Sequence, residues 1–218
     1  MDHIIEVLVG ADGVAARGAE FVAEQARAAV AARGRFTFAV SGGHTPWAMF
    51  AHLTAGDVPW ERTTLFQVDE RVAPDGDPDR NLTHLLASLG STVTDVRAMP
   101  VTAADLDASA AEYASALPEA FDLVHLGLGP DGHTASLVPG DPVLDVRDRL
   151  VALTQPYQDR RRMTFTYPAL ARARQLIWLV TGADKRAPLT RLLAHDATIP
   201  AGRVEAARSL VLADASAA

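Results

Sequence analysis

A carboxylate and an imidazole stand two residues apart near the middle of the chain, at Asp131 and His133 in a glycine-rich segment. The apolar run 122–126 before them predicts a strand, and we expect a helical turn after them. Ligands bind beyond the carboxyl ends of strands in an open α/β sheet. Because histidine is the usual general base near neutral pH, we predict that His133 accepts a proton in catalysis. Asp131 would either orient His133 through a hydrogen bond or turn into its own loop.

A second candidate site is the turn SGGHTP, residues 41–46, directly after another short apolar run. Gly42 and Gly43 let the backbone approach a ligand closely, and Thr45 and Pro46 suit the N-cap and the first position of a helix. Free amides at a helix N-terminus attract anions, so the turn predicts a phosphate site. It matches neither the P-loop nor the GxGxxG pattern, which argues against a nucleotide. The alternative is an ordinary tight turn.

Charged side chains follow a third apolar run, residues 65–68, where Asp69, Glu70 and Arg71 leave the predicted strand together. Arg71 could hold a phosphate or carboxylate through two hydrogen bonds, or stabilise the charge of an oxyanion. The plainer interpretation is a solvated loop. The position of the segment beyond a buried strand favours a site.

A run of three arginines, residues 160–162, and Lys185 at a turn between strand and helix supply further positive charge. In a chain of net charge −7, an anionic substrate needs such a local cluster to attract it. The cluster suits a phosphate dianion, although an arginine run and a lone lysine are also typical of a solvated surface.

The composition limits the class of protein. With 218 residues, of which 49% are hydrophobic, the chain can bury a large core, and we expect one domain over residues 1–218. The acidic balance argues against a nucleic-acid partner. The absence of cysteine excludes disulfides and thiolate nucleophiles, and no HxxxH or HExxH spacing suggests a metal, so we expect no metal ion and no other cofactor.

Three further patterns are missing from the sequence. No GxSxG elbow suggests a serine nucleophile. The N-terminus has no basic, apolar pattern of a secretory signal, and no apolar run reaches the ~18 residues that span a bilayer. We therefore expect a soluble, cytoplasmic protein without a membrane partner.

Apolar runs and helical periodicity alternate along the chain, which predicts an α/β fold with a doubly wound, mostly parallel sheet. The expected strands are residues 4–9, 36–40, 65–68, 122–126, 150–153, 175–180 and 209–212, and the expected helices are residues 13–33, 46–53, 81–89, 103–117 and a segment that ends near 195.

Taken together, these segments resemble the 6-phosphogluconolactonase family over nearly the whole chain. Each motif alone is weak, but five in the family's order are specific. The motifs are SGGHTP at 41–46, DER at 69–71 with Asn81, GLGPDGHTASL at 127–137, RMT at 162–164 and GADK at 182–185.

The resemblance implies hydrolysis of 6-phospho-D-glucono-1,5-lactone in the oxidative pentose phosphate pathway, with no metal or organic cofactor. It implies a modified Rossmann-like, three-layer sandwich that glucosamine-6-phosphate deaminase shares. The partner would be this small sugar-phosphate lactone, and the protein a monomer or small homo-oligomer. By similarity, His133 is the base, Asp131 its neighbour and Arg71 an active-site arginine. The implied substrate-binding residues are Gly42, Gly43, Thr45, Asp69, Arg162 and Lys185.

Three segments depart from the family pattern. Arg80-Asn81 stands where Ser-Asn is common, and Val138-Pro139-Gly140 where Phe-Pro-Gly is common. Residues 155–159 replace a Pro-Lys-Pro-Pro-like segment, so a lysine contact to substrate is lost, and Arg160 or Arg161 is the candidate replacement.

Two other functions remain open. The related aminosugar-6-phosphate deaminases and isomerases typically carry Phe-Asn-Glu-Pro where this chain has Ala135-Ser136-Leu137-Val138, so their acidic ring-opening residue is missing. A non-catalytic sugar-phosphate sensor would not need both Asp131 and His133. Both alternatives are weaker than the lactonase.

Overall fold

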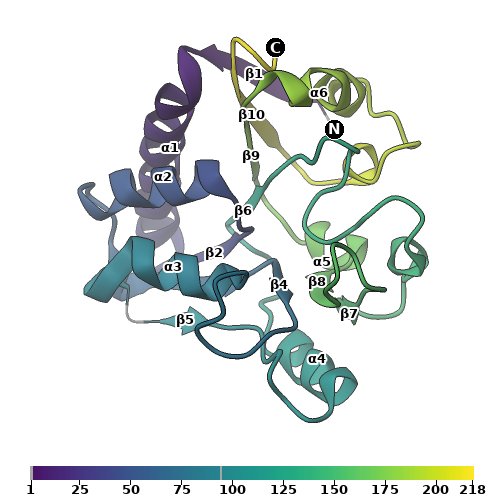
Figure 1. Ribbon diagram of the computed structural model, residues 1–218. Helices are drawn as coiled ribbons and strands as arrows, with labels where there is room; N and C mark the ends of the chain where they lie inside the picture. The colour runs from purple at the N-terminus through teal and green to yellow at the C-terminus, as the bar shows by residue number, and fades with distance from the viewer. Residues whose placement is uncertain (1, 94) are drawn as a thin grey trace.

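A parallel sheet of seven strands runs through the centre of the computed structural model, which describes residues 2–93 and 95–218 (Figure 1). This confirms the predicted α/β fold with a mostly parallel sheet. Every neighbouring pair in this sheet is parallel. From one edge to the other, the strands are β1 (His3–Leu8), β10 (Ser209–Asp214), β9 (Leu176–Val180), β6 (Leu123–Leu126), β2 (Phe36–Val40), β3 (Thr63–Gln67) and β5 (Val96–Arg97).

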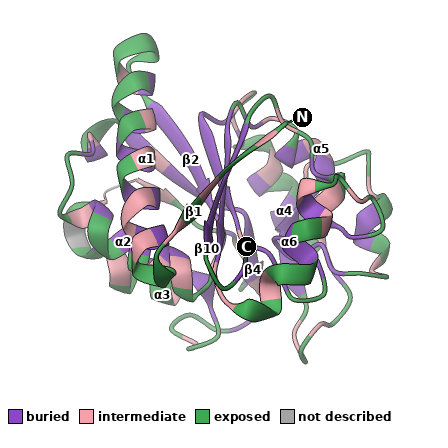
Figure 2. Ribbon diagram, turned by 90° about the horizontal axis from the view of Figure 1, so that it is seen from above, coloured by how far each residue is buried: buried purple, intermediate pink, exposed green. Residues whose placement is uncertain are grey.

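The inner strands are mostly apolar because helices or a second sheet cover both faces. All residues of β2, β6 and β9 are buried. Figure 2 shows the three layers, with the sheet in the middle. One face carries α1 (Gly10–Arg33), α2 (His44–Thr54) and α3 (Asn81–Leu89), and the other carries α4 (Leu106–Ser115), α5 (Tyr167–Leu170) and α6 (Arg186–Leu193).

A small antiparallel sheet, which the sequence analysis did not predict, lies on the second face. Its strands in order are β4 (Asp69–Arg71), β8 (Arg162–Phe165) and β7 (Val151–Leu153). The segment expected to be a loop after β3 is therefore a strand, because it pairs with β8. Short 3-10 helices lie at Trp60–Arg62, Gly90–Thr92, Pro142–Asp145, Ala183–Lys185 and Ala201–Arg203.

Helix bounds differ from expectation where capping groups decide them. Gly34 ends α1 as predicted, with φ 74° and its amide donating to the Val30 carbonyl at 2.8 Å, although the helix begins three residues before position 13. Asp105 accepts a hydrogen bond from the Ala108 amide, which makes it an N-cap, so α4 is shorter than the expected helix 103–117.

Two local predictions were wrong. The helix α2 begins at His44 with Gly43 as its N-cap, so Thr45 and Pro46 lie inside the first turn. No helical turn follows His133. Thr134 and Leu137 instead close a tight turn, in which the Leu137 amide donates to the Thr134 carbonyl at 2.9 Å.

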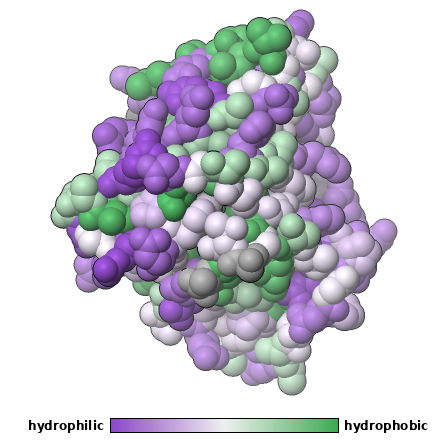
Figure 3. Space-filling view, turned by 90° about the vertical axis from the view of Figure 1, so that its left-hand side faces the viewer, coloured by the Kyte–Doolittle hydropathy of each residue, from purple (hydrophilic) through white to green (hydrophobic). Residues whose placement is uncertain are grey.

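The strand β1 is a sheet edge with an apolar outer surface. Ile4 and Val7 in β1 are 67% and 55% exposed, and Val9, just after the strand, is 93% exposed. Figure 3 shows hydrophobic residues gathered at the top of the molecule, the end at which β1 and the start of α1 lie in Figure 1, above a more hydrophilic helical face. Among the described residues, no helix combines the length and apolar character that crossing a bilayer requires.

The buried imidazole of His125 should make stability depend on pH. Burial lowers the pKa of His125 in β6 to about 3, whereas an unfolded histidine titrates near 6.5. Between these values the unfolded chain binds the extra proton, so stability falls as pH drops below 6.5. We expect the free energy of unfolding to fall by about 2 kcal/mol from this residue between pH 6.5 and pH 5, measured by urea denaturation.

His125→Gln should remove this contribution and flatten the pH dependence. His52→Gln, which changes an exposed histidine on α2, is the matched control and should keep the wild-type dependence. An equal pH dependence in wild type and His125→Gln would contradict the prediction.

Candidate active site

A cavity of about 450 Å³ opens where the central strands end. The loops that line it follow β2, β3, β6 and β9, whose carboxyl ends meet at one edge of the sheet. The strand order reverses here, because the chain proceeds from β2 to β3 on one side and places β6 on the other. Such a switch point is the usual ligand site of an open α/β sheet. Eight predicted site residues line it: Gly42, Gly43, Thr45, Asp69, Arg71, His133, Arg162 and Lys185.

The ninth, Asp131, lies behind His133 and outside the lining. Its Oδ1 lies 2.6 Å from His133 Nδ1 and also accepts the His133 backbone amide at 3.1 Å. Asp131 therefore does both things that the sequence left open, since it bonds the ring and closes its own loop. Burial acts to raise the pKa of the Asp131 carboxyl, but the hydrogen bonds and charge of His133 outweigh burial and hold this pKa below its usual range. An ionised Asp131 keeps the proton of neutral His133 on Nδ1 and leaves Nε2 as the basic atom.

Glycines bring the His133 ring into place. The Gly129 amide donates to the His133 carbonyl at 2.8 Å, and the Gly132 amide donates to the Gly129 carbonyl at 3.0 Å, so the loop closes on itself. A Cβ on Gly129 would lie 2.1 Å from His133 Nδ1, a distance that no side chain permits. Gly132 has φ +83°, which favours glycine.

The turn at residues 41–46 presents the N-terminus of α2 to the cavity. Gly43 extends the chain before the helix, with φ 133° and ψ 165°, and the first amides of α2 have no carbonyl partner within the helix. Thr45 Oγ1 lies 2.8 Å from Thr181 Oγ1, which joins this turn to the loop after β9. Amides and helix dipole together make this end of the cavity suitable for an anion.

Arg71 enters the cavity from β4 and is held at its tip. Its Nη1 donates to the Asp79 carbonyl at 2.7 Å and to Asn81 Oδ1 at 2.8 Å. Asn81 Nδ2 donates in turn to the Asp69 carbonyl at 2.9 Å. A Cβ on Gly42 would lie 2.0 Å from Asn81 Oδ1, so the Asn81 amide packs directly on the turn at residues 41–46.

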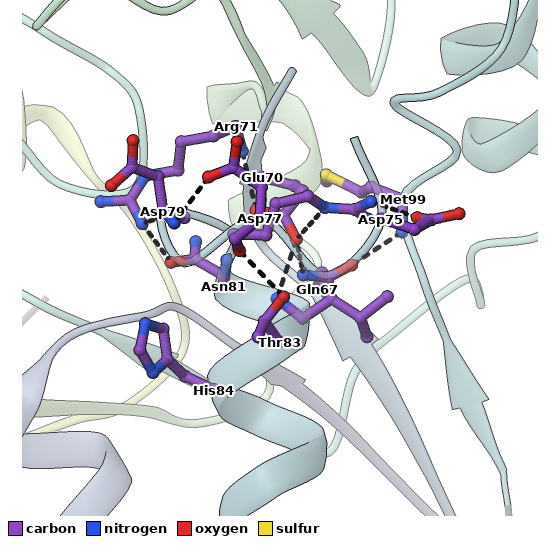
Figure 4. A network of polar contacts seen from close by, with 12 residues as sticks. Gln67, Glu70, Arg71, Asp75, Asp77, Asp79, Asn81, Thr83, His84 and Met99 are labelled. Atoms are coloured by element: carbon purple, nitrogen blue, oxygen red, sulfur yellow. Dashed lines mark hydrogen bonds and ion pairs between the residues drawn. The ribbon is translucent and has the colours of Figure 1, made fainter. Parts of the chain in front are cut away.

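Glu70 holds the backbone of Arg71 and Asn81 in place through hydrogen bonds, although the sequence analysis assigned it no role (Figure 4). Its carboxylate is fully buried at the N-terminus of α3, where an anion is favoured. No pattern in the sequence predicts this role, because only the fold places the first amides of α3 next to the Glu70 carboxylate. The donors to it are the amides of Arg71 (2.8 Å), Asn81 (2.7 Å) and Leu82 (2.8 Å), Gln67 Nε2 (2.9 Å) and Arg80 Nε (3.3 Å).

Asp69 and Ser136 connect the small sheet to the His133 loop. Asp69 is buried, and its Oδ2 accepts a hydrogen bond from Ser136 Oγ at 2.7 Å. The Ser136 amide donates to Thr164 Oγ1 at 3.2 Å. These contacts explain why the segment after His133 turns tightly instead of forming a helix.

The positive charges do not all converge as expected. Arg162 is buried in the cavity wall, where burial lowers the pKa of its guanidinium, and Lys185 pairs with Asp184 at 2.9 Å. Arg160 instead bonds the carboxylates of Asp77 and Asp79, at 3.2 and 3.1 Å. Neither Arg160 nor Arg161 lines the cavity, so neither replaces the lysine missing from residues 155–159.

A model of the family described as glucosamine-6-phosphate isomerases/6-phosphogluconolactonase matches residues 10–212. The chain belongs to this family. It is 36% identical over 207 residues to the 6-phosphogluconolactonase of Synechocystis sp., and the match covers 88% of this chain and 86% of that protein. The structure is similar to that of a 6-phosphogluconolactonase from Thermotoga maritima, with a TM-score of 0.89 and 26% identity, over 98% of this chain and 100% of the other.

The fold alone does not separate the two enzyme classes within the glucosamine-6-phosphate isomerase/6-phosphogluconolactonase family. A monomeric glucosamine-6-phosphate deaminase has a TM-score of 0.85 to this chain at 15% identity, over 100% of this chain and 98% of its own. In this chain, Ala135 lines the cavity two residues after His133, and Leu137 is fully buried. Neither side chain is acidic.

In the part of the chain that the structure describes, no group of three or more His, Asp or Glu side chains is arranged to hold a metal ion.

Proposed function

We propose that this protein hydrolyses 6-phospho-D-glucono-1,5-lactone to 6-phospho-D-gluconate, a step of the oxidative pentose phosphate pathway. One observation carries the proposal above the others: a hydrogen-bonded Asp131–His133 pair at 2.6 Å shares a cavity with an anion-binding helix terminus. The family membership and the 6-phosphogluconolactonase names of similar proteins support it.

The phosphate binds at the N-terminus of α2, where the amides after Gly43 and the Thr45 hydroxyl donate hydrogen bonds to it. Arg162 and Lys185 add positive charge at the same cavity. When the substrate binds, Lys185 leaves its exposed partner Asp184 and pairs with the phosphate dianion, which carries more negative charge than a carboxylate. Phosphate binding then sets the distance from the lactone carbonyl to His133.

Neutral His133 takes a proton from water on Nε2, and the resulting hydroxide bonds to the lactone carbonyl carbon. The carbonyl oxygen becomes an oxyanion, which Arg71 stabilises. The bond from this carbon to the ring oxygen then breaks, and the imidazolium returns its proton to that oxygen. The lactone carbonyl becomes a carboxylic acid, the ring oxygen becomes a hydroxyl, and His133 is neutral again. Asp131 stays ionised and stabilises the imidazolium.

A lactone-hydrolysis assay at controlled pH tests this proposal, with the spontaneous opening of the lactone subtracted. We expect rapid turnover by the protein and no ammonia release from glucosamine 6-phosphate. Ammonia release without lactone hydrolysis would assign the deaminase function. Binding of 6-phosphogluconate with turnover of neither substrate would assign a sensor.

A further inference from the structure

The hairpin that joins β7 to β8 ends in a tight turn beside the Asp131–His133 pair. The Tyr157 amide donates to the Arg160 carbonyl at 2.9 Å, and the two residues between them, Gln158 and Asp159, have φ of 51° and 62°. Two-residue turns of this geometry strongly favour glycine, asparagine or aspartate. Gln158 is none of these, so an unfavourable backbone is retained next to Tyr157. Such strain is commonly found at functional positions.

The turn directs Tyr157 toward the Asp131–His133 pair. The Tyr157 hydroxyl donates to Asp131 Oδ2 at 3.3 Å, while Asp131 Oδ1 bonds His133. The edge of the Tyr157 ring faces His133, with centroids 5.7 Å apart and planes at 66°. Tyr157 therefore contacts both members of the pair, and His133 also lines the cavity.

The same turn holds Arg162 against the Tyr157 ring. The Arg162 Cζ lies 5.0 Å from the ring centroid, and its Nη2 donates to Gln158 Oε1 at 3.0 Å. A guanidinium over an aromatic face is attracted to it, more strongly when both are shielded from water. Arg162 is 5% exposed.

We propose that Tyr157 is a positioning residue, which couples the Asp131–His133 pair to the phosphate-binding Arg162 by touching both. This inference rests on the proposed function. The hydroxyl takes up part of the charge of Asp131 and fixes the direction of its carboxylate, and the ring fixes the plane of the Arg162 guanidinium. Residues 155–159 are also the segment in which this chain departs from its family's pattern, so the arrangement belongs to this chain's own residues.

The two contacts of Tyr157 can be tested separately, because its hydroxyl contacts Asp131 and its ring contacts Arg162. Tyr157→Phe removes only the hydroxyl bond to Asp131 and keeps the ring under Arg162. Asp131 then carries its full charge toward His133 and holds the imidazole proton more tightly, so more alkaline pH is needed for catalysis. In the described part of the chain, the titratable groups near His133 are Asp131 and Tyr157, and those lining the same cavity are His44, Asp69, Arg71, Arg162, Asp184 and Lys185.

The experiment compares pH profiles of lactone hydrolysis for wild type, Tyr157→Phe and Tyr157→Ala. For Tyr157→Phe we expect kcat to fall about 2- to 10-fold with KM nearly unchanged. The midpoint of the acidic limb of kcat/KM should rise by roughly 0.3–0.5 of a pH unit. For Tyr157→Ala we expect KM to rise as well, by about 2- to 10-fold, because Arg162 loses its ring.

Tyr167→Phe is the matched control. The Tyr167 hydroxyl also donates one hydrogen bond, to the Pro200 carbonyl at 3.0 Å, and its ring also lies under an arginine, Arg147 at 5.2 Å. Its pH profile should equal that of wild type. A wild-type profile and kcat in Tyr157→Phe would overturn the positioning role while the wild-type activity upholds the proposed function. A wild type without lactonase activity would overturn both.

Discussion

Replacing His133 with alanine is expected to lower kcat for lactone hydrolysis by about 10²- to 10⁴-fold, the usual contribution of a positioned general base. KM should change little, because the proposed phosphate contacts come from the turn at residues 41–46, Arg162 and Lys185. The increase of rate with pH that reflects loss of the His133 proton should disappear. Initial rates across pH 5 to 8, corrected for spontaneous opening, measure all three effects.

Asp131→Asn gives a second measurement of the same mechanism. The pKa of Asp131 lies below its usual range, so this carboxylate stays charged wherever the enzyme is assayed and does not itself produce the acidic limb. We expect a smaller loss of kcat than in His133→Ala. His52→Ala, on the exposed side of α2, controls for loss of a histidine and should behave as wild type. Wild-type kcat in His133→Ala would rule out the assigned base.

Glu70→Ala is expected to lower the free energy of unfolding by about 3–5 kcal/mol, the usual result of removing one member of a buried ion pair. Arg80, which is 2% exposed, loses this partner, and the first amides of α3 lose their acceptor. Urea denaturation at pH 7 measures the change. Activity should fall too, because Arg71 and Asn81 are no longer held by their backbone amides.

The exposed Glu112 on α4 provides the control for Glu70→Ala. Glu112→Ala removes the same side chain from a helix surface and should change the free energy of unfolding by less than about 0.5 kcal/mol. Glu70→Gln retains an acceptor of similar shape and should recover part of the loss. Equal stabilities of Glu70→Ala and Glu112→Ala would contradict the role assigned to Glu70.

The sequence predicts the central sheet well because strands buried on both faces appear in it as apolar runs. Residues 36–40 are apolar except for Thr37, residues 176–180 are a continuous apolar run, and both segments are strands buried throughout. The loops after them could therefore be placed at one edge of the sheet, together with the residues expected to bind substrate.

In the small sheet, only β7 was expected as a strand, at residues 150–153. Asp69 and Arg162 are charged yet buried, because they face the cavity and not solvent, so their strands look like loops in the sequence. Glu70 and Tyr157 escaped notice for a related reason. Their partners lie 10 to 12 and 26 residues away along the chain, and only the folded arrangement brings them together.

The contact between Gly42 and Asn81 has a consequence for how this site can evolve. Asn81 fills the space that any side chain at position 42 would need, and it also holds Arg71. A larger residue at 42 would thus disturb Arg71 as well as the turn at residues 41–46. Positions 42 and 81 are expected to change together or not at all, because a substitution at either one alters both the turn and the support of Arg71.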